Sequence, residues 1–291
     1  MKKIEVPCPV CDSPKYKVLY EDTLGERYPA FTYDFSINFN LTYRIVQCLD
    51  CTHCYASPRH EDLYVNYDGD KPDTIYLDLQ HQRVVTDQEV IKEVLKHAPS
   101  GRLLDVGCAT GDFMNEAKKH YQTEGLELST WSTKMAQERG FTVHQCLLEK
   151  FDMPQSFDVV TLWGVIEHFE YPAKEIANIH KLLKKGGIVA LWTGDIDSLF
   201  PKIIGKKWWY FQGQHIQMFT GASMKKLFSS NGFEAVYMGR YPYILTKRSI
   251  NNSLSRYPFL HFLIKPIINL GIFNNMKIKL PGEMFAIFRK T

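Results

Sequence analysis

Four cysteines near the amino terminus form two short pairs with the spacing of metal ligands. Cys8-Pro-Val-Cys11 and Cys48-Leu-Asp-Cys51 are each a C-x-x-C turn, which presents two thiolates together. Two such turns facing each other make a tetrahedral site, so the spacing predicts a zinc ion held by Cys8, Cys11, Cys48 and Cys51. Cys54 offers a fifth thiol, but it lies in an apolar run and is interpreted as a small buried side chain. With four protein ligands the site would be closed and therefore structural. A redox pair is the weaker alternative, because neither turn opens a helix after a strand.

A glycine loop is the second candidate for chemistry. The apolar run Leu103–Val106 predicts a buried strand, and a helical pattern begins at Asp112, so Gly107 and Gly111 lie in a sharp turn between them. The spacing is neither the dinucleotide fingerprint nor a phosphate-binding loop with its Lys-Ser/Thr. Glycine lets a ligand approach the backbone closely. The loop therefore favours a ligand with a ribose and an amino-acid tail but no pyrophosphate.

The stretch LLDVGCATG at 103–111 resembles the first motif of the class I S-adenosylmethionine (SAM)-dependent methyltransferases. Further motifs arrive in the family's order, among them the strand Phe157–Trp163 and the LLKKGG sequence at 182–187. The resemblance implies an α/β fold: a Rossmann-like seven-stranded sheet, six strands parallel and one antiparallel, that binds SAM. Phe233–Gly239 and Glu283–Arg289 read as the closing antiparallel pair. An ordinary strand-turn-helix is the alternative for the glycine loop alone.

The resemblance also implies roles for side chains around the cofactor. Glu127, on the second strand Thr123–Ser129, would accept hydrogen bonds from both ribose hydroxyls. Cys146, at the end of the third strand Phe141–Cys146, stands where many relatives carry an aspartate for adenine, so apolar neighbours would hold the base. Tyr76, before the predicted helix Gln82–His97, would close the site, or it covers a domain junction. The expected cofactor-binding residues are Tyr76, Asp105, Gly107, Cys108, Ala109, Gly111, Glu127, Leu128, Cys146, Leu147 and Trp163.

The acceptor side resembles the ubiquinone-pathway O-methyltransferases and their sugar methyltransferase relatives. Gly164 replaces the first carboxylate of the Glu-x-x-Glu-His group that can hold magnesium in the quinone enzymes, so no catalytic metal is expected. Glu167 and His168 either cap and orient the next helix or, for His168, take part in catalysis.

A later segment, which carries four consecutive aromatic residues and a lone histidine, supplies further acceptor-side candidates. Sugar C-methyltransferases have Glu-His where this chain has Gln214-His215, which favours O-methylation with His215 as the base, or a structural role for His215. Ahead of it, Trp208, Trp209, Tyr210 and Lys207 are the expected acceptor contacts, the lysine for a phosphate.

Composition and patterning set the wider expectations. A net charge of +3 is too small to argue for nucleic acid. The absence of an apolar leader and the paired cysteines favour the cytoplasm. We expect a zinc-ribbon-like β module at 1–60, a connector and helix at 61–100, and a SAM-binding domain at 101–291 with an insertion at 240–282. An amphipathic helix near Leu254–Ile268 suits a dimer partner, an acceptor site or a membrane, but its prolines and modest charge favour packing against the protein itself.

The most favoured function is methyl transfer from SAM to a hydroxyl of a small-molecule acceptor: a sugar, a sugar nucleotide or a secondary metabolite. Two alternatives stay open. One is an RNA methyltransferase that grips its substrate with the zinc module, for which a clustered basic face is missing. The other is a non-catalytic SAM-binding scaffold, which the departures at Ala109, Cys146 and Gly164 make conceivable. The acceptor class depends on family analogy.

Overall fold

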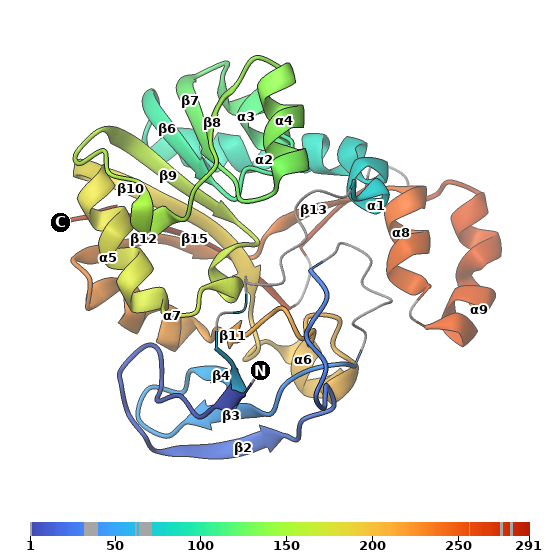
Figure 1. The fold of residues 1–291 in the computed structure, drawn as a ribbon. Coiled ribbons are helices and arrows are strands. Elements are labelled where there is room, and N and C mark those ends of the chain that lie inside the picture. Colours follow the sequence, from blue (N-terminus) through green and yellow to red (C-terminus); the bar gives the residue numbers. More distant parts are fainter. Residues whose placement is uncertain are drawn as a thin grey trace.

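Among the described residues, seven strands form the central sheet (Figure 1). The computed structural model describes residues 2–31, 40–61, 63, 72–255, 257–273, 276–279 and 282–291. In spatial order the strands are β12 (Phe233–Gly239), β15 (Glu283–Lys290), β10 (Leu183–Gly194), β9 (Phe157–Trp163), β6 (Gly101–Val106), β7 (Tyr121–Leu126) and β8 (Thr142–His144). Only β15 runs against its neighbours, since both its pairings are antiparallel and the pairings among β10, β9, β6, β7 and β8 are parallel. The predicted sheet of six parallel strands and one antiparallel strand is confirmed.

Helices cover both faces of this sheet, which is why its strands are apolar runs rather than alternating patterns. Leu103 packs with α2 (Gln80–His97) and α3 (Asp112–Ala117) on one face. Leu104, the next residue along β6, packs with α5 (Pro172–Leu182) and α7 (Gly221–Ser229) on the other. The helix α4 (Thr130–Glu138) follows β7. The helix predicted at 82–97 is confirmed as α2, two residues longer at its start.

A second, smaller sheet is built by the amino-terminal part of the chain. It contains β2 (Tyr16–Tyr20), β3 (Ile45–Cys48) and β4 (Cys54–Ala56), and its fourth strand, β11 (Gln217–Met218), comes from the later part. A separate antiparallel pair joins β1 (Lys3–Ile4) to β5 (Arg59–His60). The alternating apolar residues at 31–45 predict β structure with a bend at 36–38, and residues 36–38 lie outside the described part of the chain. Because β11 completes this sheet, the amino-terminal module and the larger domain share hydrogen bonds as well as a core.

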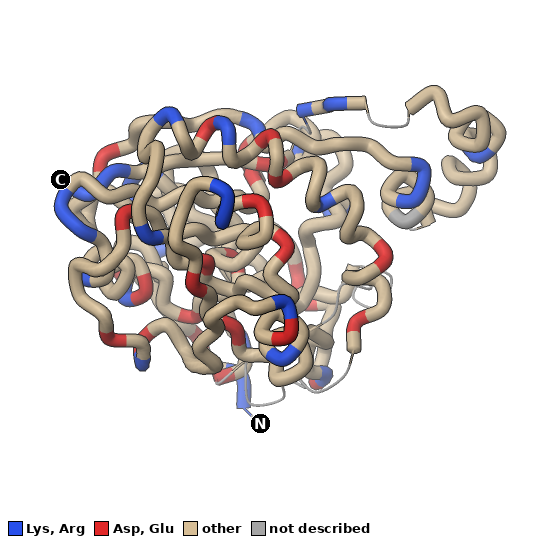
Figure 2. The backbone as a smooth tube through the Cα atoms, turned by 90° about the horizontal axis from the view of Figure 1, so that it is seen from above, with Lys and Arg blue, Asp and Glu red and all other residues tan. Residues whose placement is uncertain are grey.

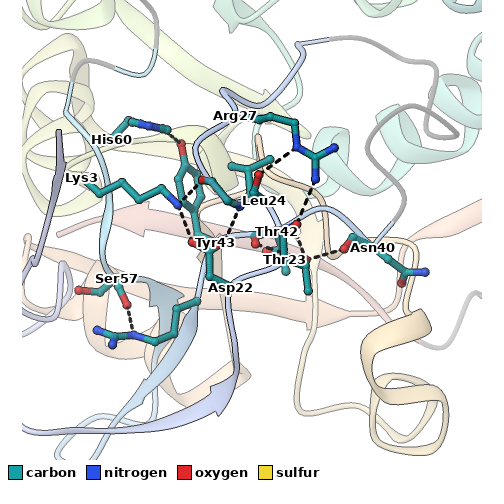
Figure 3. Close-up of polar contacts among 12 residues, drawn as sticks. Lys3, Asp22, Thr23, Leu24, Arg27, Asn40, Thr42, Tyr43, Ser57 and His60 are labelled. Carbon is teal, nitrogen blue, oxygen red and sulfur yellow. Dashed lines mark hydrogen bonds and ion pairs between the residues drawn. The ribbon is translucent and has the colours of Figure 1, made fainter. Parts of the chain in front are cut away.

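Polar contacts fix the loop between β2 and β3 (Figure 3). Lys3 Nζ donates to Asp22 Oδ2 at 2.6 Å, and the Tyr43 hydroxyl is 2.8 Å from His60 Nδ1. Leu24, shortly after the end of β2, is buried in the same cluster as Tyr210 and Ile216. The amino-terminal module therefore packs directly against the segment that carries His215.

The insertion at 240–282 projects from the body as a pair of helices (Figure 1). It begins with β13 (Pro242–Leu245), continues through α8 (Lys247–Leu254) and α9 (Pro258–Asn269), and returns on β14 (Met276–Lys279), which pairs with β13. The prediction of one helix over 254–268 was wrong at its start. α8 ends at Leu254 and a new helix, α9, begins at Pro258; the residue before a proline disfavours helical backbone, and Tyr257 is not helical.

In the described parts of the chain, no helix combines the length and apolar character needed to cross a membrane.

Candidate functional site

The glycine loop turns the chain from β6 into α3. Gly107 has φ +70°, and a Cβ there would lie 2.6 Å from Val165 Cγ2. Gly111 has φ +80° and serves as the left-handed N-cap of α3. Both positions therefore favour glycine on conformational grounds, and Gly107 also on steric grounds. Ala109 takes φ 46° without that freedom, as a small residue in the same turn.

Glu127 is the first residue beyond β7 and is buried beside this loop. Its Oε2 accepts the Ala109 N–H at 2.9 Å, and its Oε1 accepts the N–H groups of Leu128 at 2.7 Å and Ser129 at 2.8 Å. Burial raises the pKa of Glu127 above its ordinary value, while these three N–H groups favour the ionised form. The carboxylate is thus held rigidly at the carboxyl edge of the sheet, where open α/β folds bind ligands.

A cavity of about 1020 Å³ opens along this edge. Eight of the expected cofactor residues line it: Tyr76, Gly107, Ala109, Glu127, Leu128, Cys146, Leu147 and Trp163. Three others, Asp105, Cys108 and Gly111, do not. Asp105 is buried below the loop, where it accepts a hydrogen bond from Thr161 Oγ1 at 2.6 Å. Cys108 points into the packing against Gly125, whose added Cβ would come 2.5 Å from Cys108 Sγ.

Two lining residues at the start of α4 were missed by sequence reasoning. Trp131 and Ser132 face the cavity directly after the N-cap Ser129. A helix that starts immediately after the acidic residue of the second strand was the available signal, because its first turn must lie at the same sheet edge.

Tyr76 reaches the cavity from the short helix α1 (Thr74–Asp78), which Asp73 caps by accepting the Tyr76 N–H at 2.9 Å. The Arg83 guanidinium lies 3.4 Å from the centre of the Tyr76 ring and pairs with Asp112 at 2.8 Å. This chain of contacts links α1 to the first turn of α3, next to the glycine loop. Tyr76 is therefore placed at the rim of the expected cofactor site.

Three titratable side chains that line the same cavity meet in a cluster. The ligand atoms of Glu167, His168 and His215 all lie within 4.8 Å of one another. Glu167 and His168 belong to the turn η3 (Ile166–His168) after β9, and His215 lies just before β11. The expectation that Glu167 caps the next helix was wrong, because α5 has no side-chain cap and Glu167 Oε2 instead accepts a hydrogen bond from Thr193 Oγ1 at 3.0 Å.

Backbone carbonyls set the tautomer of both histidines. His168 Nδ1 is 2.9 Å from Gln214 O and His215 Nδ1 is 2.8 Å from Tyr210 O. A carbonyl only accepts, so each Nδ1 carries the proton and each Nε2 carries the lone pair. Burial lowers the pKa of His168 to about 4 and that of His215 well below its ordinary value. Both rings are therefore neutral near pH 7.

Glu167 differs from its neighbours because burial moves its pKa upward, to about 7. The carboxyl thus exchanges its proton close to neutrality, beside two neutral imidazoles. The cluster suits general acid–base chemistry. Its geometry also suits a divalent cation, so the expected absence of a catalytic metal, which depended on Gly164, stays a prediction.

The aromatic run at 208–211 divides between core and cavity. Trp209 lines the cavity with a half-buried ring, whereas Tyr210 borders the cavity but is itself fully buried in the same core cluster as Trp208. Trp208 is fully buried in the core cluster that joins the module to this segment, stacked on Tyr210 at 5.0 Å between ring centres. Lys207 does not line the cavity either, and its carbonyl accepts the Tyr257 hydroxyl proton. The tight turns around 205–211 point neighbouring side chains in opposite directions.

The four expected zinc ligands come together at the tips of two matching turns. In each turn the residue four after the first cysteine (Asp12 or Thr52) has a positive φ and donates its N–H to that cysteine's carbonyl. Cys8 Sγ lies 3.5 Å from Cys51 Sγ, and Cys11 Sγ lies 3.6 Å from Cys48 Sγ. A tetrahedral zinc ion with bonds of about 2.3 Å requires sulfur atoms about 3.8 Å apart, so the donor set fits zinc.

Cys54 stays outside this group. It is buried within β4 in a hydrophobic cluster, which confirms its interpretation as an apolar side chain.

Comparisons with known proteins agree with this architecture. A family model described as "Methyltransferase domain" matches residues 79–238, more than half of the chain. An uncharacterized protein of Methanocaldococcus jannaschii is 32% identical over 120 residues, which are 40% of this chain and 56% of that protein. A ubiquinone biosynthesis O-methyltransferase of Paracidovorax citrulli is 35% identical over 102 residues, 32% of this chain and 43% of that protein. The chain spans about half the length of the curated relatives it matches.

Solved structures show the same fold. A SAM-dependent methyltransferase of Thermotoga maritima, described as a possible histamine N-methyltransferase, aligns with a TM-score of 0.53 at 18% identity, covering 75% of this chain and 94% of that one. A SAM-dependent methyltransferase of Archaeoglobus fulgidus aligns with a TM-score of 0.52 at 16% identity, covering 75% and 100%. With the family match, the strand order and the glycine loop all in agreement, the chain belongs to the methyltransferase domain family and has the fold of the SAM-dependent methyltransferases.

Proposed function

We propose that the chain methylates a hydroxyl group of a small-molecule acceptor, with His215 as the general base. The observation that carries this proposal is the neutral His215, which lines the cavity close to Glu167 and whose Nδ1 is held by the Tyr210 carbonyl. When held by the glycine loop and Glu127, SAM would supply an electrophilic methyl group for an acceptor oxygen, with S-adenosylhomocysteine as the leaving product. The hydroxyl proton passes to His215 Nε2.

Glu167 stabilises the imidazolium that this proton transfer produces. A buried positive charge is costly without an opposite charge nearby, and the Glu167 carboxylate is within 4.8 Å. Thr193 and Tyr210 fix that carboxyl group in place, since Thr193 Oγ1 bonds both Glu167 Oε2 and the Tyr210 hydroxyl. The remaining contribution is positioning of the acceptor.

Aromatic residues around this cluster support a flat or ring-shaped acceptor. Trp209 and Tyr171 line the cavity with half-buried or exposed rings, and such faces stack on rings. Lys174 also lines it, but its ammonium pairs with Glu149 at 2.5 Å. With Lys207 outside the cavity, an uncharged sugar or secondary metabolite is favoured over a sugar nucleotide. The O-methyltransferase named among the relatives supports oxygen as the acceptor atom.

We also propose that Cys8, Cys11, Cys48 and Cys51 hold a structural zinc ion. The ion would pin the Cys8–Cys11 turn, which precedes β2, to the Cys48–Cys51 turn between β3 and β4, and β4 pairs with β11. His53 extends this link, with Nε2 2.9 Å from Gln217 Oε1 on β11. Zinc would in this way fix the segment that carries His215, without touching the cofactor.

The test is methyl transfer from labelled SAM to a pool of small molecules from cell extract, followed by identification of the labelled product. We expect an ether methyl group on a ring hydroxyl, and a loss of turnover of at least about a hundredfold in His215→Gln with an unchanged SAM dissociation constant. Full turnover by His215→Gln would overturn the base assignment, and a labelled carbon or nitrogen would overturn O-methylation. SAM binding without transfer to any acceptor would favour a scaffold.

A further inference from the structure

The insertion at 240–282, called the arm from here on, exposes a row of large apolar side chains. On α9, Phe259 is 78% exposed, Phe262 76% and Leu263 53%, and Leu270 just beyond it is 74% exposed. The prediction that the arm packs against the protein itself was wrong for this helix. Only its inner side is covered, where Ile268 is buried and His261 Nε2 lies 2.8 Å from Asn251 Oδ1 of α8.

The exposed residues lie on one side of the helix. Positions 259, 263, 267 and 270 follow the three- and four-residue spacing that aligns side chains along one face. Ile267 is 43% exposed, so this face is apolar from the start of α9 to its end. Contiguous exposed apolar surface of this kind marks an interaction site.

The charge of the arm identifies the chemistry of the partner. Its charged residues are all basic: Arg240, Lys247, Arg248, Arg256, Lys265, Lys277 and Lys279, with no Asp or Glu between Gly239 and Glu283. Figure 2 shows the projecting helices in tan and blue without red. Arg248 and Lys277 pair with Asp78 and Glu89 of the body, whereas in the described part of the chain no ion pair involves Lys265 or Lys279.

We propose that the arm docks on the surface of an anionic lipid bilayer, with the apolar face of α9 inserted at the boundary between headgroups and acyl chains. A helix with Phe and Leu on one side and lysine nearby has the composition of an interfacial helix, and anionic headgroups attract the surrounding basic residues. A second copy of this chain fits less well, because two arms would bring like charges together.

Docking there would place the cavity beside the membrane. Arg248 of α8 pairs with Asp78 of α1, whose residues 74–76 line the cavity, and the Tyr257 hydroxyl donates to the Lys207 carbonyl at 2.6 Å in the segment that carries Trp209. The arm is therefore fastened to two segments of the cavity rim. This inference is independent of which acceptor the enzyme uses.

Vesicle flotation of the full-length chain tests the proposal. We expect binding to vesicles of phosphatidylglycerol and phosphatidylcholine, weak binding to phosphatidylcholine alone, and release by high salt. Phe262→Asp should lower the partition coefficient by at least about tenfold. Lys265→Gln should lower it about fivefold on anionic vesicles only.

Matched controls separate docking through the arm from nonspecific adsorption to vesicles. Ile203 on α6 (Leu199–Ile204) is 71% exposed, so Ile203→Asp changes a similarly exposed apolar residue outside the arm and should leave binding unchanged. Lys225→Gln on α7 is the matching control for Lys265→Gln. SAM binding by each variant reports that it is folded. Binding that is equal for Phe262→Asp and the wild type overturns the proposal. The proposal is also overturned if the protein forms a dimer without lipid and Phe262→Asp dissociates that dimer, since a second copy would then cover α9.

Discussion

Replacing Glu127 by Gln tests how the chain holds the cofactor ribose, and the structure sets the size of the effect. A carboxylate offers about four lone-pair positions. Three of them already accept the N–H groups of Ala109, Leu128 and Ser129, at 2.9, 2.7 and 2.8 Å. One position is left for the ligand. We therefore expect one strong hydrogen bond from the ribose rather than one from each hydroxyl.

A hydrogen bond to a charged group contributes about 1.5–3 kcal/mol. Losing it should raise the SAM dissociation constant about 10- to 150-fold, since each 1.4 kcal/mol is tenfold. Isothermal titration of folded Glu127→Gln against wild type measures this change. Glu124→Gln is the matched control, because Glu124 lies on β7 but pairs with Arg102 and His144 outside the cavity.

The pH dependence gives the same test a second readout. Burial raises the folded-state pKa of Glu127, so wild-type affinity should fall as acid protonates the carboxyl, beginning above the pH at which an ordinary glutamate titrates. Glu127→Gln should lack that fall. A dissociation constant within twofold of the wild type for Glu127→Gln would show that Glu127 does not hold the ribose.

Three further outcomes are expected. Cys51→Ser should lower the zinc content, measured by metal analysis, and abolish methyl transfer, while titration shows that SAM binding persists. Unchanged turnover in a zinc-free chain would show that the module does not support the segment that carries His215. The pKa of Glu167 is raised to about 7, so in acid its carboxyl is neutral and cannot stabilise the imidazolium of His215. We therefore expect kcat/KM to rise with pH through about 7. A rise that persists unaltered in Glu167→Gln would assign the titration to another group. Gly107→Ala places a Cβ 2.6 Å from Val165 Cγ2 at φ +70°, so it should lower the free energy of unfolding by at least about 1–2 kcal/mol, seen as a lower Tm; an unchanged Tm would show that the loop relaxes without strain.

Local patterns were sufficient for the sheet and for most of the residues expected around the cofactor, eight of which line the cavity. The apolar runs of β6 and β9 and the glycines at 107 and 111 mark a buried strand that turns sharply into a helix, and these features follow from backbone geometry within a few residues. The cysteine spacing likewise predicted which four thiols would meet. Such features are local, so the sequence carries them directly.

The acceptor side was harder because its groups come from distant parts of the chain. Glu167 and His168 follow β9, His215 precedes β11, and their meeting depends on how the 205–216 segment folds over the sheet. The four neighbouring aromatics looked alike in sequence, yet Trp208 packs inward while Trp209 faces the cavity. Side-chain direction in an irregular turn has no fixed period, so spacing could not separate them.

By itself the sequence determined the protein family, the strand-turn-helix at the expected SAM site and the cysteine set of the module, because each depends on short-range spacing. Tertiary structure alone decided which carboxyl group joins the two histidines, how many acceptor positions Glu127 keeps for a ligand, and which face of α9 meets solvent. Those properties depend on burial and on contacts between residues far apart in the chain. The packing of the whole molecule sets the partners of each side chain, and these partners decide its protonation and its exposure.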